Sequence, residues 1–368
     1  MNKKLLASTA LAGVMFAGSS FAQTTVTGNL NLSYKAIGST GSSAVVNSSR
    51  FFGKEVQIDI QNKGKLNNGV DYAAGFSIEH DGAQMSSQST TTTTDSLGIM
   101  SENVYIDFIF GNTTFSIGAD HGQNPDNEPA NLVGVVDFDD LVAGVNNKLP
   151  NYNSVAKAGS AYEAFGVSVA QKTPVGNFIV RYIPSSNTGL ASPDDGGVGT
   201  AAPSVYDAGE SIYEIGFRGD LGVKGLDLQA YYDNKSAGGV GVNSNIVGKF
   251  LGVKYNAGDV TFAVAEKRLD TVSAINTVST KGRSYGVAYA VDKNISLGLS
   301  YAVTDEPTSS TGTSTPNKEK IKQVSLGYNL GPVFTGVSYG KVENNDNTAG
   351  SDRKSTRLNS SHITISYA

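Results

Sequence analysis

Residues 284–301 read SYGVAYAVDKNISLGLSY and hold two alternating segments around one short polar turn. Every second residue of these segments is apolar or aromatic: Tyr285, Val287, Tyr289, Val291, Ile295, Leu297, Leu299 and Tyr301. The residues between them are almost only Ser, Gly and Ala. Because successive side chains of a strand point to opposite faces, this stretch predicts a β-hairpin with one apolar face and one face of small side chains.

The same period of two runs through most of the chain, beginning at Val26–Tyr34. It predicts about fifteen strands, which start near Thr25, Phe51, Val70, Asn103, Thr113, Phe165, Phe178, Ser211, Leu226, Asn245, Val260, Ser284, Ile295, Ile321 and Val333. The connections alternate between tight turns, such as Gly111-Asn112, and longer polar segments, such as Gly82–Ser96 and Pro184–Ala208. Antiparallel strands joined in this way carry all of their long connections on one rim.

The first 22 residues have the organisation of a secretory signal peptide. Two lysines precede an apolar run from Leu5 to Phe16, and small residues then lead to a cleavage site between Ala22 and Gln23. The alternative, a membrane-spanning helix, needs about 20 apolar residues, and this run is shorter. No later segment is long and apolar enough for such a helix either. The sequence therefore predicts export.

The composition excludes several classes of protein. The chain has no Cys, so it carries no disulfide scaffold, no thiolate chemistry and no Cys-based zinc site. Three His offer little material for a metal centre, and a formal charge of −5 gives no footprint for a nucleic acid. Neither H-E-x-x-H nor a P-loop occurs. We therefore expect no enzyme activity, no cofactor, no metal and no nucleic-acid partner.

The placement of aromatic residues indicates which face of the sheet is wet. Tyr and Phe gather on the apolar faces near strand ends, at Tyr34, Phe52, Phe110, Phe165, Tyr182, Phe217, Tyr232, Tyr255, Tyr289, Tyr301, Tyr328 and Tyr339. Aromatic girdles at both interfaces are typical of outer-membrane barrels. A soluble sandwich would bury these faces, but so many strands would need two or three domains, and no linker divides the chain. We predict an all-β fold, a transmembrane antiparallel β-barrel with a polar lumen.

The connection from Asp120 to Ser160 is the longest and lacks alternation. It carries six carboxylates: Asp120, Asp126, Glu128, Asp137, Asp139 and Asp140. Long loops inside a compact domain are usually functional, and carboxylates at a pore constriction favour cations. The alternative is an acidic surface loop in solvent. The spacing does not match a calcium-binding EF-hand loop.

With these features the chain resembles the general diffusion porins of Gram-negative bacteria. The resemblance is carried by the signal peptide with Thr25–Ala36, by Val104–Asp120 (VYIDFIFGNTTFSIGAD), and by the acidic segment. It implies a porin barrel over residues 23–351 with 16 strands, a homotrimer in the lipid of the cell outer membrane, and passive diffusion of ions and small hydrophilic solutes through a water-filled channel. It also implies that residues of about 120–160 form the third external loop, which constricts the pore.

The family places a basic cluster on the wall opposite the acidic loop. Basic candidates here are Lys35, Arg181, Arg218, Lys254 and Lys267, which the alternation turns inward, and Arg50, which lies just before a strand. The inward acidic residues are more numerous: Glu55, Asp59, Asp71, Glu79, Asp107, Glu214, Asp227 and Asp233. This balance predicts a weak preference for cations. Two alternatives stay open, a substrate-selective outer-membrane channel and an exported β-rich adhesin without a pore.

The last 17 residues, 352–368, form a separate case. They read DRKSTRLNSSHITISYA and resemble, codon for codon, a translated sequencing adapter with its index. We therefore expect a non-native tail and a truncated gene record, in which the sixteenth strand of the barrel is lost. The alternative is that Ile363–Ala368 is a genuine short closing strand.

Overall fold

The computed structural model describes residues 23–40, 49–81, 99–119, 165–184, 211–236, 244–273, 277–305, 318–331, 333–344, 352–360 and 365–367. Within these ranges the regular secondary structure is entirely β-strand, and no helix there is long and apolar enough to cross a membrane. The strands are β1 (Gln23–Thr40), β2 (Ser49–Lys65), β3 (Asp71–Asp81), β4 (Ile99–Phe110), β5 (Thr113–Ala119), β6 (Phe165–Thr173), β7 (Gly176–Ile183), β8 (Ile212–Gly219), β9 (Leu226–Ser236), β10 (Ser244–Ala257), β11 (Val260–Ser273), β12 (Thr277–Ala290), β13 (Ile295–Asp305), β14 (Glu319–Asn329), β15 (Phe334–Glu343), β16 (Asp352–Ser360) and β17 (Ile365–Tyr367).

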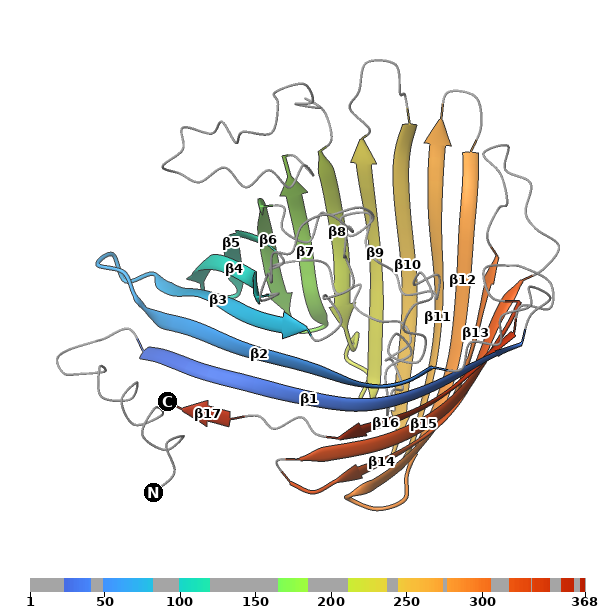
Figure 1. Ribbon diagram of the computed structural model, residues 1–368. Helices are drawn as coiled ribbons and strands as arrows, with labels where there is room; N and C mark the ends of the chain where they lie inside the picture. The colour runs from blue at the N-terminus through green and yellow to red at the C-terminus, as the bar shows by residue number, and fades with distance from the viewer. Residues whose placement is uncertain are drawn as a thin grey trace, which may run out of the picture.

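From β1 to β16 each strand pairs antiparallel with the next along the chain, which gives one sheet that curves into a wall around a central space (Figure 1). The tight turns have local chemical causes. In the turn between β12 and β13 the Asp292 carboxylate accepts hydrogen bonds from the backbone N–H groups of Asn294 and Ile295. The turn between β10 and β11 uses Gly258 at a φ of 76°, a conformation that glycine adopts without steric cost.

The two faces of the sheet differ in polarity and exposure. On β13, Leu297 and Leu299 are 42% and 60% exposed, whereas Ala302 and Thr304 on the other parity are buried. The buried parity faces the inside of the curved sheet and carries many polar side chains: Ser77, Ser116, Ser168, Arg181, Glu214, Gln229, Asp233, Lys235, Ser284, Thr304, Glu319, Gln323, Ser325 and Ser338. A soluble domain would have the opposite arrangement. An exposed apolar face and a polar interior match a barrel surrounded by lipid.

Fifteen of the predicted strands are present as β1 to β15, most of them beginning close to the predicted residue. The largest difference is at β12, which begins at Thr277 and not at Ser284. The outward positions in this first part of β12 hold Ser279, Lys281 and Arg283. The strand therefore continues beyond the part of the outward face that is apolar. Because its outward residues are polar there, the alternation of apolar and polar residues does not reveal this part of the strand.

The C-terminal tail supplies the strand beyond β15. β16 pairs with β15 over Arg353–Ser360 and with β1 over Leu32–Thr40, and β17 pairs with Val26–Gly28. Strand pairing thus returns from β15 to β1 through β16, although residues 29–31 of β1 have no register partner on that side among the described residues. The tail occupies the place of the sixteenth strand that the sequence predicts to be lost.

Candidate functional site

The inner wall is the candidate site, because its side chains would meet any solute that passes through the barrel. Over β1 to β4 neutral and acidic side chains of the wall are joined by hydrogen bonds. The Thr27 hydroxyl and the Gln57 amide donate hydrogen bonds to the Asp59 carboxylate over 3.3 Å and 3.1 Å. Gln61 on β2 and Tyr105 on β4 are also hydrogen-bonded across the wall. These bonds hold the polar side chains against the strands.

A buried charged group lies on β7, β8 and β9. Arg181 and Glu214 are directly opposite each other on β7 and β8, and Glu214 is in turn opposite Asp233 on β9. The Arg181 Nη1 atom lies 3.6 Å from the Glu214 Oε2 atom, and both side chains are only 1% exposed. Asp233 is fully buried, and Lys235 on the same strand is 9% exposed. Buried charges of this kind depend on their partners for stability.

A second charged group lies on β8, β9 and β10, close to the rim that carries the short turns. The Asp227 carboxylate accepts two hydrogen bonds from the Arg218 guanidinium, at 3.2 Å and 3.0 Å, and lies 3.3 Å from the Lys254 ammonium. Arg218 keeps 52% of its side chain exposed. One carboxylate therefore holds two cations at this mouth of the barrel.

Neutralising this carboxylate should make the barrel admit anions more readily. Asp227→Asn leaves the charges of Arg218 and Lys254 uncompensated. An ion that passes about 8 Å from a unit charge in water gains or loses about 0.5 kcal/mol, which is a factor of about two. Cations lose this factor and anions gain it, so we expect the cation-to-anion permeability ratio to fall by about fivefold in dilute salt. Reversal potentials across planar bilayers measure it, and an unchanged ratio would show that this group lies outside the ion path.

The structure places part of the predicted site on the inner wall. Arg181, Arg218, Lys254, Lys267, Asp59, Glu79 and Asp107 all have the inward parity. Asp71 also has this parity, at the mouth of the barrel, and its carboxylate lies 2.5 Å from the Lys65 ammonium. Arg50 shares the parity of Phe52, whose ring is 85% exposed, so Arg50 lies on the outward face and not with the lumen residues.

Other predicted residues lie outside what the structure describes. These are the cleavage-site residue Ala22 and the whole acidic segment with Asp120, Asp126, Glu128, Asp137, Asp139 and Asp140. Gln23 is the first residue of β1, and the backbones of Lys35 and Glu55 lie in β1 and β2, but the side chains of Lys35 and Glu55 are not among those described. The sequence reasoning missed Lys235 and Glu319, both buried on the inner face. Lys235 lies two residues from Asp233, and Glu319 lies two residues from Ile321, so each shares a strand face with a residue that points inward. This spacing was the signal in the sequence that could have identified them.

The sequence model of the family described as Gram-negative porin matches residues 7–347. The chain belongs to the Gram-negative porin family. Its place is therefore the outer membrane, where it forms a porin channel. The match ends before the tail that begins at Asp352, and no curated protein sequence matches the chain.

Solved structures show the same fold at low sequence identity. The anion-selective porin from Comamonas acidovorans is 11% identical to this porin, with a TM-score of 0.66 over 94% of this chain and 100% of that one. OmpF of Salmonella typhi, solved in complex with daunomycin, is 12% identical, with a TM-score of 0.65 over 96% and 100%. A mutant of the Rhodopseudomonas blastica porin is 14% identical, with a TM-score of 0.56 over 93% and 100%. At such identities only the fold carries over, and roles of single residues do not.

Proposed function

We propose that this porin forms a water-filled channel for passive diffusion of ions and small hydrophilic solutes, with a weak preference for cations. The observation that carries the proposal is the inversion of polarity, with an apolar face exposed and polar and charged side chains inside. The proposal includes no catalytic step. Two G-x-S-x-G stretches, at 282–286 and 336–340, lie inside β12 and β15 and not at the strand-to-helix turn that this motif requires.

The cation preference rests on the acidic segment and not on the described wall. On the wall, cations and carboxylates are paired with each other, as in Arg181 with Glu214 and in Arg218 and Lys254 with Asp227. Residues 120–160 contain six carboxylates and two lysines, so this segment has an excess of negative charge. The relative from Comamonas acidovorans is anion-selective with a similar fold. We therefore attribute the sign of the preference in this chain to the placement of charges and not to the shared fold.

The test is conductance of the purified porin in planar bilayers under a salt gradient. We expect a reversal potential of the sign that cation permeation gives, and a smaller one for Asp137→Asn combined with Asp139→Asn and Asp140→Asn. Asp194→Asn with Asp195→Asn and Asp207→Asn, in another long connection, removes the same number of charges, is the matched control and should change the potential less. Anions that permeate more readily than cations would contradict the preference. Saturable block by one solute would indicate a substrate-selective channel, and absence of any conductance would contradict the pore.

We also propose that the porin is a homotrimer. One structurally similar protein, OmpT of Vibrio cholerae, is described as a trimer form. A trimer of pores should open in groups of three equal conductance steps, and the unheated protein should migrate on gels as a species that heating converts to the monomer. Independent single steps and monomeric migration without heating would contradict the trimer.

A further inference from the structure

The inner wall carries an excess of positive charge at the rim of the short turns. Among the inward side chains that the structure describes at this end of β6 to β10, the cations are Lys172, Arg218 and Lys254, and the one carboxylate is Asp227. We call the three cations the mouth cluster. The turns beyond these strands carry Asp220, Lys224 and Asp259, which leave the excess positive. Porins have their short turns on the periplasmic side, so this rim is the periplasmic mouth of the pore.

One carboxylate compensates only part of the mouth cluster. The Arg218 guanidinium donates from Nε and Nη2 to Asp227, and the Lys254 ammonium lies 3.3 Å from the same carboxylate oxygen, Oδ2, that accepts from Nη2. Because both cationic groups touch one oxygen, a single small anion can bridge them. The Arg218 Nη1 group is left to donate to such an anion. Lys172 is exposed and forms no ion pair with any residue that the structure describes.

Two amide side chains flank Arg218 in the same row of the wall. Asn177 on β7 and Gln229 on β9 are directly opposite Arg218 on its two sides. The Gln229 side chain is 4% exposed, and its amide forms no hydrogen bond with another described residue. The buried Oδ1 atom of Asn177 also has no hydrogen-bond partner among the described residues. Because a buried polar group without a partner costs free energy, a ligand that bonds to these amides is stabilised.

The arrangement of these donors favours a phosphate group over a carboxylate. Lys172 on β6 is directly opposite Asn177, so one row holds Lys172, Asn177, Arg218 and Gln229, on strands about 4.8 Å apart. The edge of Arg218 that would bind a carboxylate through two parallel bonds is occupied by Asp227. The remaining N–H donors point to the ligand from several side chains, and a half-turn of the Asn177 amide adds its NH2 group. A tetrahedral phosphate offers more oxygens to such a set than a planar carboxylate does.

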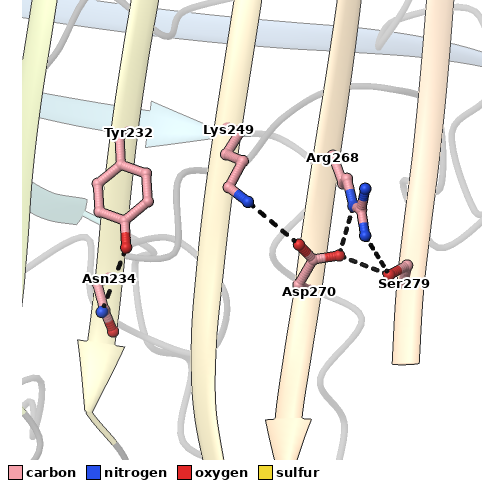
Figure 2. Close-up of polar contacts among 6 residues, drawn as sticks. All are labelled: Tyr232, Asn234, Lys249, Arg268, Asp270 and Ser279. Atoms are coloured by element: carbon pink, nitrogen blue, oxygen red, sulfur yellow. Dashed lines mark hydrogen bonds and ion pairs between the residues drawn. The ribbon is translucent and has the colours of Figure 1, made fainter. Parts of the chain in front are cut away.

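The outward face has a group of the same composition, which separates the effect of charge from that of location. Asp270 lies 2.7 Å from the Arg268 guanidinium and 3.6 Å from the Lys249 ammonium, and it accepts a hydrogen bond from the Ser279 hydroxyl (Figure 2). Lys249 shares the parity of the exposed Leu251, so this group faces away from the lumen. A solute inside the pore does not meet it. The outward group is therefore a matched control for the mouth cluster.

We propose that the mouth cluster, with Asn177 and Gln229, binds phosphate, free or as the monoester of a small solute, at the periplasmic mouth of the pore. The phosphate oxygens accept hydrogen bonds from the mouth cluster and the two amides, while Asp227 holds Arg218 and Lys254 side by side. The inference rests on the proposed pore but not on its cation preference, which we assign to residues 120–160. Conduction without block by phosphate would contradict this inference alone, whereas absence of conductance would contradict the pore.

The test is block of the potassium chloride current through single porins in planar bilayers by inorganic phosphate, at a pH where phosphate is mainly a dianion. We expect saturable block that is stronger when phosphate is added on the side of the short turns. The chain has no Cys, so Lys293→Cys in the exposed turn between β12 and β13 can carry a biotin label, and streptavidin then identifies that side. Equal block from both sides would overturn the placement of the site at the periplasmic mouth.

Substitutions separate a built site from the general effect of charge. Arg218→Gln and Lys254→Gln should each raise the half-blocking concentration of phosphate about fivefold, the effect of one unit charge at about 4 Å in water. Arg268→Gln, the matched control on the outward face, should leave this concentration unchanged. Gln229→Leu keeps the charge and should raise the concentration about fivefold through loss of one hydrogen bond. Gln171→Leu, which removes an exposed amide on the outward face of β6, is its control.

The identity of the blocking anion is a further arm of the experiment. Glycerol phosphate should block as inorganic phosphate does, and succinate, whose two negative charges lie on separate carboxylates, should block more weakly. Equal block by succinate and phosphate would overturn the assignment to phosphate, and no block by glycerol phosphate would overturn its extension to monoesters. Equal effects of Arg218→Gln and Arg268→Gln, or no effect of Gln229→Leu, would overturn the site itself. Heat-modifiable migration on gels reports that each variant is folded.

Discussion

Deletion of residues 352–368 is expected to abolish the folded barrel. β16 pairs with β15 along one edge and with β1 along the other, so its removal exposes the N–H and C=O groups of both strands to lipid. Each such group costs several kcal/mol when nothing replaces its hydrogen bond. The deleted porin should show neither heat-modifiable migration nor conductance. Full retention of both would show that β1 and β15 can pair without the tail.

The same tail should be a poor strand in lipid, and this has a separate test. The positions of β16 in register with outward Thr335 and Tyr339 hold Ser360 and Thr356, which are polar. Thr356→Val with Ser360→Val should stabilise the barrel by about 1 kcal/mol for each added apolar group. Ser355→Val with Asn359→Val, in register with Gly340 and Gly336 on the inward parity, is the matched control and should give no gain. Equal effects of the two pairs would contradict this account.

The origin of the tail is open to a direct measurement. We propose that the natural chain continues from about residue 351 with a different last strand, since residues 352–368 resemble a translated adapter and the family match ends at residue 347. Re-sequencing of the locus should give other codons from Asp352 onward. Genomic reads that run through Asp352 with the present codons would refute this.

Most of the strand pairs of this barrel could be predicted from the local sequence pattern. The alternation around Tyr285 and Leu299 predicts the hairpin of β12 and β13. The apolar side chains on every second residue are stable only when that face of the strand is turned toward the lipid. Where strands leave the apolar band, this constraint disappears. The start of β12 and the outward place of Arg50 were missed for that reason, since polar residues there are compatible with either face.

The tail shows that a strand can also form where the sequence pattern does not predict one. Its residues 352–360 lack the alternation of a lipid-facing strand, yet they form β16 because the open edges of β1 and β15 supply hydrogen-bond partners whatever the side chains are. Contacts on the inner wall were predictable only in part. Parity places Arg181, Glu214 and Asp233 inside, but the strand register that sets them side by side is a property of the folded sheet.

Replacement of Arg181 by Met is expected to destabilise the barrel by about 3–5 kcal/mol, the usual cost of removing one partner of a buried ion pair. The substitution keeps the length and the apolar stem of the side chain and removes its charge. Glu214 and Asp233 then face each other across β8 and β9 without the guanidinium beside them. Thermal unfolding in detergent, monitored by heat-modifiable migration, should show a clearly lower transition temperature.

Two controls distinguish a buried charge from a general packing defect. Arg218→Met removes a cation whose side chain is 52% exposed, and exposed pairs contribute at most about 1 kcal/mol, so its effect should be small. Arg181→Met combined with Glu214→Gln removes both charges and should recover much of the lost stability, because the cost lies in the carboxylate left behind. If Arg181→Met and Arg218→Met lowered the transition equally, or if the double variant were less stable than Arg181→Met alone, burial of the pair would not be the cause. The inner wall would then tolerate an isolated carboxylate at Glu214, which requires water to reach that position.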